Sequence, residues 1–368
     1  MPRRANESFQ VQCWTIRRNK IRNIVFEYLL YSLDTNMLMG IDLDCPLVQA
    51  LIAVSVVGFL TVISLLKFYA FVTCGRCKSS AKMNGKTVIV TGATGGIGKE
   101  TAKNLAARGA RVIMACRNTE YGNQVRDELV KETNNENIVV KKLDLASQKS
   151  IREFASDINQ TESRLDVLIH NAGTAEMRSK VSEDGLELTM ATNHFGPFLL
   201  THLLIDLLKR SAPSRIVVVA SELYRLASVN LNKLNPVNSF VPAYLYYVSK
   251  YVNIYFTLEL ARRLQGTNVT ANCLHPGMID SGIWRNVPAP LSWPLKLIVK
   301  SFFKTPEQGC QTSVHLAVSE EVEGVSGKYY MDCKEKALSN AASDMAKAKK
   351  VWEQSEKLAN LQPEDQRI

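Results

Sequence analysis

The longest apolar run in the chain covers residues 47–66 and is interrupted by a single amide side chain, Gln49. The run contains no charged residue and is long enough to cross a hydrocarbon core about 30 Å thick. We therefore predict a transmembrane helix over 46–68. A buried core helix is the alternative, but the rest of the chain contains a complete globular pattern that leaves such a helix no obvious packing partner.

Downstream, short apolar segments alternate with helical ones. Residues 86–90 form a brief apolar run typical of a buried strand, 91–98 follow as a glycine-rich turn, and 99–108 have a helical pattern. A second strand, 110–118, follows at the spacing of a β-α-β unit. Glycine in such a turn lets the backbone approach a pyrophosphate, and the helix N-terminus receives the anion. The pattern predicts an α/β fold with a dinucleotide site.

The end of the second strand distinguishes two cofactors. An acidic residue there would bond the ribose of NAD, but this chain has Arg117, whose guanidinium can pair with a 2′-phosphate and stack on adenine. We therefore predict NADP(H) as the cofactor. A solvated surface arginine is the alternative.

Tyr246 and Lys250 lie four residues apart at the start of a helix-like run, so they share one helical face. A phenol with a pKa of about 10 exchanges protons poorly at neutral pH, and a neighbouring ammonium stabilises the phenolate. The pair predicts an acid/base site in which Lys250 lowers the pKa of Tyr246. An amphipathic helix with a chance tyrosine and lysine is the alternative.

With these features in place, residues 83–335 resemble the short-chain dehydrogenase/reductase family. The resemblance rests on motifs that occur in the family's order. In chain order the matching residues are Thr91, Gly92, Gly96, Ile97 and Gly98 of the cofactor turn, Asp144 and Leu145 after the third strand, Asn171, Ala172 and Gly173 after the fourth, and then Asn193, Ser221, Tyr246, Lys250, Pro276, Gly277 and Ser281.

The resemblance implies a doubly wound Rossmann fold, with a mostly parallel seven-stranded sheet and helices on both faces. The apolar run predicts that one transmembrane helix precedes this fold. It implies that Tyr246 moves the proton and that Ser221 bonds the same substrate oxygen. It also implies that Lys250 holds the nicotinamide ribose, that Asn193 anchors a relay water, and that the other matching residues bind NADP(H).

Three positions depart from the family's usual pattern. Ala220 removes one of the paired serines that usually end the strand before the catalytic tyrosine. Ser281 replaces a threonine near the nicotinamide carboxamide, where either hydroxyl can donate. His170 precedes Asn171, and a lone histidine at a strand end is more often structural than catalytic.

Within the family, residues 115–118, 192–198, 304–309 and 327–330 are most similar to the microsomal and mitochondrial retinol dehydrogenases. This implies interconversion of retinol and retinal. The apolar, aromatic stretch 278–303 fits a loop that covers a lipophilic substrate and dips into the membrane, the alternative being aromatics that only pack on the domain. A reductase of steroid or lipid-derived carbonyls and a non-catalytic membrane scaffold stay open.

Charges beside the apolar run predict its orientation. Basic residues follow it and acidic residues precede it: Lys67, Arg76, Lys78, Lys82 and Lys86 against Asp42 and Asp44. This bias predicts a catalytic domain on the cytosolic side of the endoplasmic reticulum. Residues 1–45 are basic and amphipathic, which is also typical of a mitochondrial presequence, so the mitochondrial inner membrane is the alternative. A solvated tail, or a later start at Met37 or Met39, also stays open.

The composition limits the kinds of partner that this chain is expected to bind. The chain has 45 Lys and Arg against 35 Asp and Glu, but no basic stripe interleaved with aromatics, so we expect membrane lipid and no nucleic acid. Cys74 and Cys77 have zinc spacing without a second pair, so we expect no metal. Within 336–368, apolar residues at helical spacing predict a C-terminal amphipathic helix. A homo-oligomer stays open.

Overall fold

The computed structural model describes residues 45–238, 241–279, 303–365 and 368. Ser281 and most of the predicted substrate loop lie outside these residues, and so does almost all of the basic segment 1–45. The chain divides after Leu65 into two compact units.

Helix α2 (Pro46–Thr73) includes the segment predicted to span the membrane. Its part Pro46–Leu65 has a mean hydropathy of 2.3 and none of it is buried, so by length and composition it can cross a membrane. The hydroxyls of Thr61 and Ser64 each donate to a carbonyl four residues back, at 2.8 Å. These two polar groups are therefore satisfied within the helix and do not require water.

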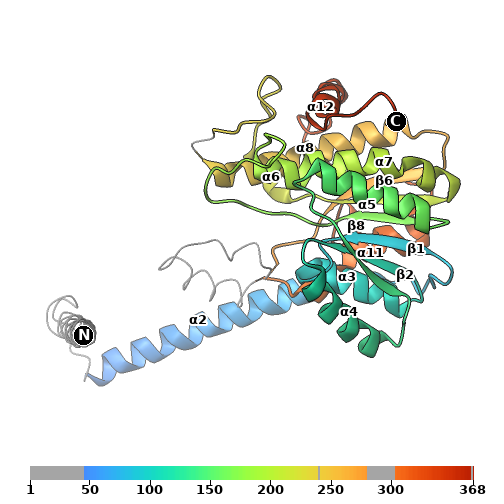
Figure 1. The fold of residues 1–368 in the computed structure, drawn as a ribbon. Helices are drawn as coiled ribbons and strands as arrows, with labels where there is room; N and C mark the ends of the chain where they lie inside the picture. Colours follow the sequence, from blue (N-terminus) through green and yellow to red (C-terminus); the bar gives the residue numbers. More distant parts are fainter. Residues whose placement is uncertain (1–44, 239–240, 280–302, 366–367) are drawn as a thin grey trace, which may run out of the picture. The chain divides into compact units, whose positions relative to one another are not determined.

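The second unit contains an eight-stranded sheet in the order β3-β2-β1-β4-β5-β6-β7-β8 (Figure 1). Its first seven strands pair in parallel, and β8 is antiparallel to β7. The resemblance implied seven strands, and the two-residue β8 at the sheet edge is the additional one. The strands are β1 (Thr87–Thr91), β2 (Arg111–Cys116), β3 (Ile138–Lys142), β4 (Val167–His170), β5 (Ser214–Val219), β6 (Val269–His275), β7 (Tyr329–Met331) and β8 (Lys334–Glu335).

Helices cover both faces of this sheet (Figure 1). Helices α5 (Gln148–Thr161), α7 (Gly196–Arg210) and α8 (Pro242–Arg263) share one core cluster. Helices α3 (Gly96–Ala107), α4 (Thr119–Thr133) and α11 (Gln311–Val318) share the other. In β1, Ile89 belongs to the first cluster and Val88 and Val90 to the second, because successive strand side chains point to opposite faces. The doubly wound α/β prediction is confirmed. The remaining short elements are α6 (Leu188–Met190), η1 (Ala191–Phe195), η2 (Glu222–Leu226), α10 (Pro306–Gly309) and η4 (Glu320–Val322).

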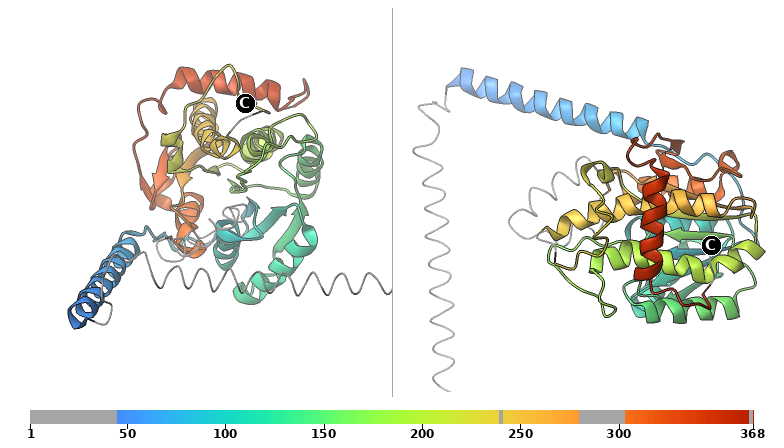
Figure 2. Two further views of the ribbon diagram at one scale, coloured as in Figure 1. Left: turned by 90° about the vertical axis from the view of Figure 1, so that its left-hand side faces the viewer. Right: turned by 90° about the horizontal axis from the view of Figure 1, so that it is seen from above.

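Near the C-terminus, α12 (Met345–Leu358) lies across the outer side of the α7–α8 layer (Figure 2). Trp352 is buried, stacks on Phe256 with ring centroids 5.9 Å apart and meets Phe198 edge-on at 4.9 Å. The Ser355 hydroxyl lies 2.8 Å from Nε2 of buried His194. Aromatic burial and this polar contact together hold α12 on the domain.

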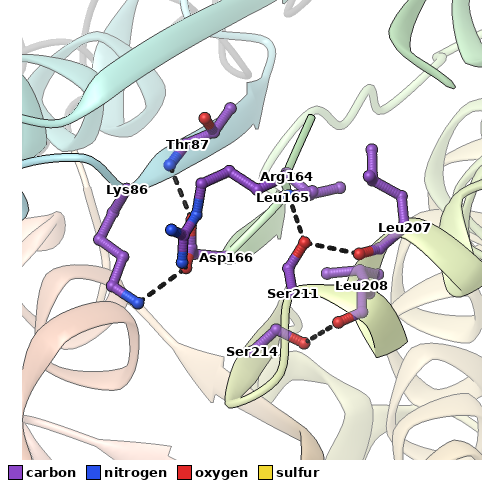
Figure 3. Close-up of polar contacts among 9 residues, drawn as sticks. All are labelled: Lys86, Thr87, Arg164, Leu165, Asp166, Leu207, Leu208, Ser211 and Ser214. Atoms are coloured by element: carbon purple, nitrogen blue, oxygen red, sulfur yellow. Dashed lines mark hydrogen bonds and ion pairs between the residues drawn. The ribbon is translucent and has the colours of Figure 1, made fainter. Parts of the chain in front are cut away.

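Polar groups close the edge of the sheet at the amino ends of its strands (Figure 3). Asp166, just before β4, accepts hydrogen bonds from Lys86 Nζ and the backbone N–H of Thr87, both at 2.9 Å, and from Arg164 at 2.8 and 2.6 Å. Burial raises the pKa of Asp166, but these donors outweigh it and hold the pKa below its usual range. The last carbonyls of α7 are closed by two serine hydroxyls, those of Ser211 and Ser214.

Candidate active site

The loop between β1 and α3 has the shape that a pyrophosphate needs. Gly92 and Gly96 have φ angles of +68° and +53°, which other residues adopt at a cost. A Cβ on Gly98 would lie 2.2 Å from the Gly92 carbonyl oxygen. The N-cap residue of helix α3 is Gly95, which has no side chain to accept hydrogen bonds from the first N–H groups of the helix. This glycine cradle fits a dinucleotide phosphate at the helix N-terminus.

The segment after β4, residues 171–173, packs against the glycine cradle. Asn171 Nδ2 donates to the Thr91 carbonyl at 2.9 Å, and the Thr91 hydroxyl accepts from the N–H groups of Asn171 and Ala172 at 3.0 Å. A Cβ on Gly92 would lie 2.9 Å from Ala172 Cα. Because β1 and β4 are the neighbours at which the strand order reverses, the cradle lies at the topological switch point where such sheets bind ligands.

Arg117 directly follows β2 and is exposed. Its positive charge acts on Glu176, in the loop after β4. Burial raises the pKa of Glu176, but hydrogen bonds from Lys180 and Thr174 outweigh burial and lower it. The charges of Lys180 and Arg117 lower this pKa further. The next residue, Asn118, caps α4 by accepting from the Tyr121 N–H. The Arg117 guanidinium thus carries an exposed positive charge at the end of β2.

Asp144 and Leu145 follow β3, beside α7. Asp144 Oδ1 accepts from the Ala146 N–H at 3.0 Å, and Leu145 is buried. A Cβ on Gly196 would lie 2.2 Å from the Leu145 carbonyl oxygen, so glycine is needed there for the start of α7 to approach this segment. Both residues therefore lie at the carboxyl edge of the sheet, the edge at which the glycine cradle follows β1.

Tyr246, Ser221 and Lys250 come together where β5 and α8 meet. Ser221 lies two residues after the end of β5, is buried, and is hydrogen-bonded to Tyr246. Lys250 is buried, donates from Nζ to the Val219 carbonyl at 2.7 Å and lies 5.6 Å from the centre of the Tyr246 ring. Gly173 is close as well, since a Cβ there would lie 3.5 Å from Lys250 Nζ. The ammonium of this group thus lies beside the segment after β4.

Asn193 lies in the π-helical segment η1, an irregularity frequent at functional sites. Its Oδ1 accepts from the Thr174 N–H at 2.8 Å, and its Nδ2 donates to the Thr174 carbonyl and to Ser249 Oγ, both at 2.9 Å. Its backbone carbonyl accepts from Asn253 Nδ2 at 2.9 Å. The side chain therefore ties the loop after β4 to α8. The sequence analysis did not identify Ser249 and Asn253. The available signal was their spacing, because Ser249 lies one helical turn after Tyr246 and Asn253 one turn after Ser249.

Pro276 and Gly277 follow β6 at the same edge. Gly277 has φ +99°, and a Cβ there would lie 2.8 Å from Cδ of Lys304. Glycine is needed here both for its backbone conformation and for the close approach of the lysine stem.

A family model described as short chain dehydrogenase matches residues 86–291. The chain belongs to this family. It is 48% identical over 291 residues to Retinol dehydrogenase 14 of Mus musculus, covering 76% of this chain and 87% of that protein. It is 43% identical over 310 residues to Retinol dehydrogenase 13 of Homo sapiens, covering 81% and 91%. The resemblance to the retinol dehydrogenase group is confirmed.

Solved structures of other proteins have the same fold. A protein from Mycobacterium Paratuberculosis described as putative uncharacterized is 29% identical with a TM-score of 0.62, covering 78% of this chain and 98% of that one. A short chain dehydrogenase from Escherichia coli CFT073, complexed with NADPH, is 25% identical with a TM-score of 0.56, covering 69% and 99%. Family and fold together support an oxidoreductase with a nicotinamide cofactor.

The acid/base pair of this short-chain dehydrogenase differs from the expectation in one respect. Burial raises the pKa of Tyr246 to about 12, and the hydrogen bond to Ser221 offsets only part of the shift. Burial also lowers the pKa of Lys250 to about 8. The net direction for the tyrosine pKa is opposite to the expected lowering, because loss of hydration dominates both groups.

The three departures from the family pattern have different outcomes. His170 is buried, its Nε2 lies 2.8 Å from Thr201 Oγ1, and burial lowers its pKa to about 3, as suits a structural histidine. Ala220 is buried in the core cluster under α8, where a methyl group fits. Ser281 lies outside the described residues.

Proposed function

We propose that this short-chain dehydrogenase interconverts retinol and retinal with NADP(H). The observation that carries the proposal is the meeting of Tyr246, Ser221 and Lys250 beside the glycine cradle. The retinol dehydrogenase relatives support a lipophilic substrate. Exposed Arg117 at the end of β2, where an acidic residue would favour NAD, supports NADP(H).

Each residue then has a defined task in reduction. When bound, the nicotinamide cofactor supplies the hydride to the carbonyl carbon. Tyr246 Oη donates the proton to the carbonyl oxygen, and Ser221 Oγ donates a hydrogen bond to the same oxygen and orients it. Lys250, held by the Val219 carbonyl, places positive charge beside the phenolate that remains. In oxidation the same atoms act in the reverse order.

The proposal includes the membrane. Acidic residues before α2 and basic residues after it favour a catalytic domain in the cytosol, on the endoplasmic reticulum. Cytosolic NADPH would then drive retinal toward retinol. Protease added to sealed microsomes should digest the chain after Lys86. Full protection would reverse this orientation, and recovery of the native chain in mitochondria would favour the presequence interpretation.

Turnover by membranes containing the full chain tests class and substrate together. All-trans-retinal, a keto-steroid and a long-chain lipid aldehyde are each offered with NADPH or NADH, and Tyr246→Phe membranes serve as the blank. We expect retinal reduction with NADPH to be the fastest reaction. Faster turnover of the steroid or aldehyde would replace retinal as the substrate. Cofactor-dependent turnover of none of them would favour the scaffold.

A further inference from the structure

The segment that follows α2 is bound to the catalytic domain at a specific turn. We call Cys74–Cys77 the tether. The Gly75 N–H donates to Asp332 Oδ1 at 3.3 Å, and the Cys77 N–H donates to Gln311 Oε1 at 3.1 Å. A Cβ on Gly75 would lie 2.0 Å from the Asp332 carbonyl oxygen. Contact this close to a backbone atom admits only glycine.

Asp332 has two further ties. It directly follows β7 with φ +53°, a left-handed conformation that is uncommon outside glycine and is held here by its surroundings. The same Oδ1 accepts from Lys304 Nζ, and this ion pair is mostly buried, with 18% and 25% of the two side chains exposed. One carboxylate oxygen thus joins the tether to Lys304.

Lys304 in turn covers the loop after β6. Its N–H donates to the Met278 carbonyl at 2.8 Å, and its side-chain carbons and Nζ lie 2.8 to 3.1 Å from the position of a Cβ on Gly277. Because β6 and β7 are parallel and His275 is in register with Met331, Pro276 and Asp332 emerge side by side at the carboxyl edge. This is the edge at which open α/β sheets bind their ligands.

We propose that Asp332 is a positioning residue that links the tether to the Pro276–Gly277 loop through Lys304, so that seating of the tether sets the affinity for the nicotinamide cofactor. The inference rests on the proposed function, in which Pro276 and Gly277 contact that cofactor. It assigns the region just after the membrane helix a share in the active site beyond anchoring.

Binding measurements on the full chain in detergent micelles test this. NADPH and NADH are titrated into wild type, Gly75→Ala and Asp332→Ala, and kcat is measured at saturating cofactor. We expect roughly five- to tenfold weaker binding of the preferred cofactor in both variants, with kcat within about twofold of wild type. Asp332→Asn, which keeps Oδ1 as an acceptor, should restore most of the affinity and serves if Asp332→Ala does not fold.

Two matched controls separate this link from general damage. Gly58→Ala adds the same methyl group within α2, where nothing lies within 4 Å, and Glu335→Gln neutralises the exposed partner of Lys328 on the same β7–β8 hairpin. Both should bind the cofactor like wild type. If the tether acts on cofactor binding only through Asp332, the Gly75→Ala/Asp332→Ala double variant should bind the cofactor no more weakly than Asp332→Ala alone.

The outcomes are distinguishable. Wild-type affinity in Gly75→Ala and Asp332→Ala overturns the link, even if their melting temperatures fall, and so do additive losses in the double variant. If wild type itself binds neither NADPH nor NADH, the proposed function fails and the inference falls with it.

Discussion

At the amino edge of the sheet, the buried Asp166 carboxylate accepts hydrogen bonds from three residues, whereas at the carboxyl edge buried Lys250 donates to one carbonyl, that of Val219. The consequence appears in their pKa values. Donors hold the pKa of Asp166 below its usual range although burial opposes them, while burial lowers the pKa of Lys250 to about 8. A fully paired charge stabilises the fold, and an underpaired one is brought toward the pH at which it can exchange a proton.

Apolar exposure also separates the two edges. Several of the large apolar side chains exposed in the second unit follow the carboxyl ends of β4, β5 and β6 or lie just before α8: Met177, Val181, Leu226, Val241 and Met278. The others lie on helices α2, α4 and α12: Phe68, Val72, Tyr121 and Met345. The amino edge instead presents ion pairs such as Arg111 with Glu162. The candidate catalytic residues and part of the exposed apolar surface therefore lie at the same edge, which suits the proposed lipophilic substrate.

The largest effect is expected from removing one oxygen at the carboxyl edge. Tyr246→Phe should lower kcat by about 10²- to 10⁴-fold, because the ring still packs but no proton moves. Cofactor affinity should stay within a few-fold, and the melting temperature should be unchanged. Tyr247→Phe on the same helix is the control and should stay active. Equal turnover by wild type and Tyr246→Phe would remove the proton-transfer role.

A smaller effect is expected at the outer end of the same edge. Arg117→Asp should raise the KM for NADPH roughly ten- to a hundredfold, since a charge-assisted phosphate contact contributes about 1.5 to 3 kcal/mol. The KM for NADH should change little, because NADH has no 2′-phosphate. Arg126→Asp, on the exposed side of α4, is the control. A parallel change for both cofactors would leave Arg117 a surface residue.

The amino edge should respond in stability and not in chemistry. Asp166→Asn should lower the free energy of unfolding by about 2 kcal/mol, because it leaves Lys86 and Arg164 without their carboxylate. The KM and kcat of the folded enzyme should be unchanged. Asp127→Asn removes an exposed ion pair and should cost at most about 0.5 kcal/mol in a denaturant titration. A fall in kcat for Asp166→Asn would break the division between the two edges.

Features of the fold and the site were predictable where their sequence pattern lies within one short segment of the chain. The strand, glycine turn and helix around Gly92 were predictable because their pattern lies within one short segment, and the order of the motifs indicated the parallel sheet. The contact of Gly75 with Asp332 joins residues 257 positions apart and has no local pattern. The pKa of Tyr246 was predicted in the wrong direction, because burial depends on packing that Lys250, one helical turn away, does not reveal.

The finest test of the comparison is the pH dependence of the carboxyl edge. With a pKa of about 8, Lys250 is charged below that pH and neutral above it, while Tyr246, at about 12, keeps its proton throughout. Retinal reduction should therefore be level near neutral pH and fall by up to about tenfold per pH unit above 8, as the charge that stabilises the phenolate is lost. Stopped-flow rates at saturating NADPH measure this fall, the alkaline limb of the pH–rate profile. Lys250→Arg keeps its charge at those pH values, so it should shift the limb upward even if the rate is lower. A limb that stays near pH 8 in Lys250→Arg would assign the titration to another group.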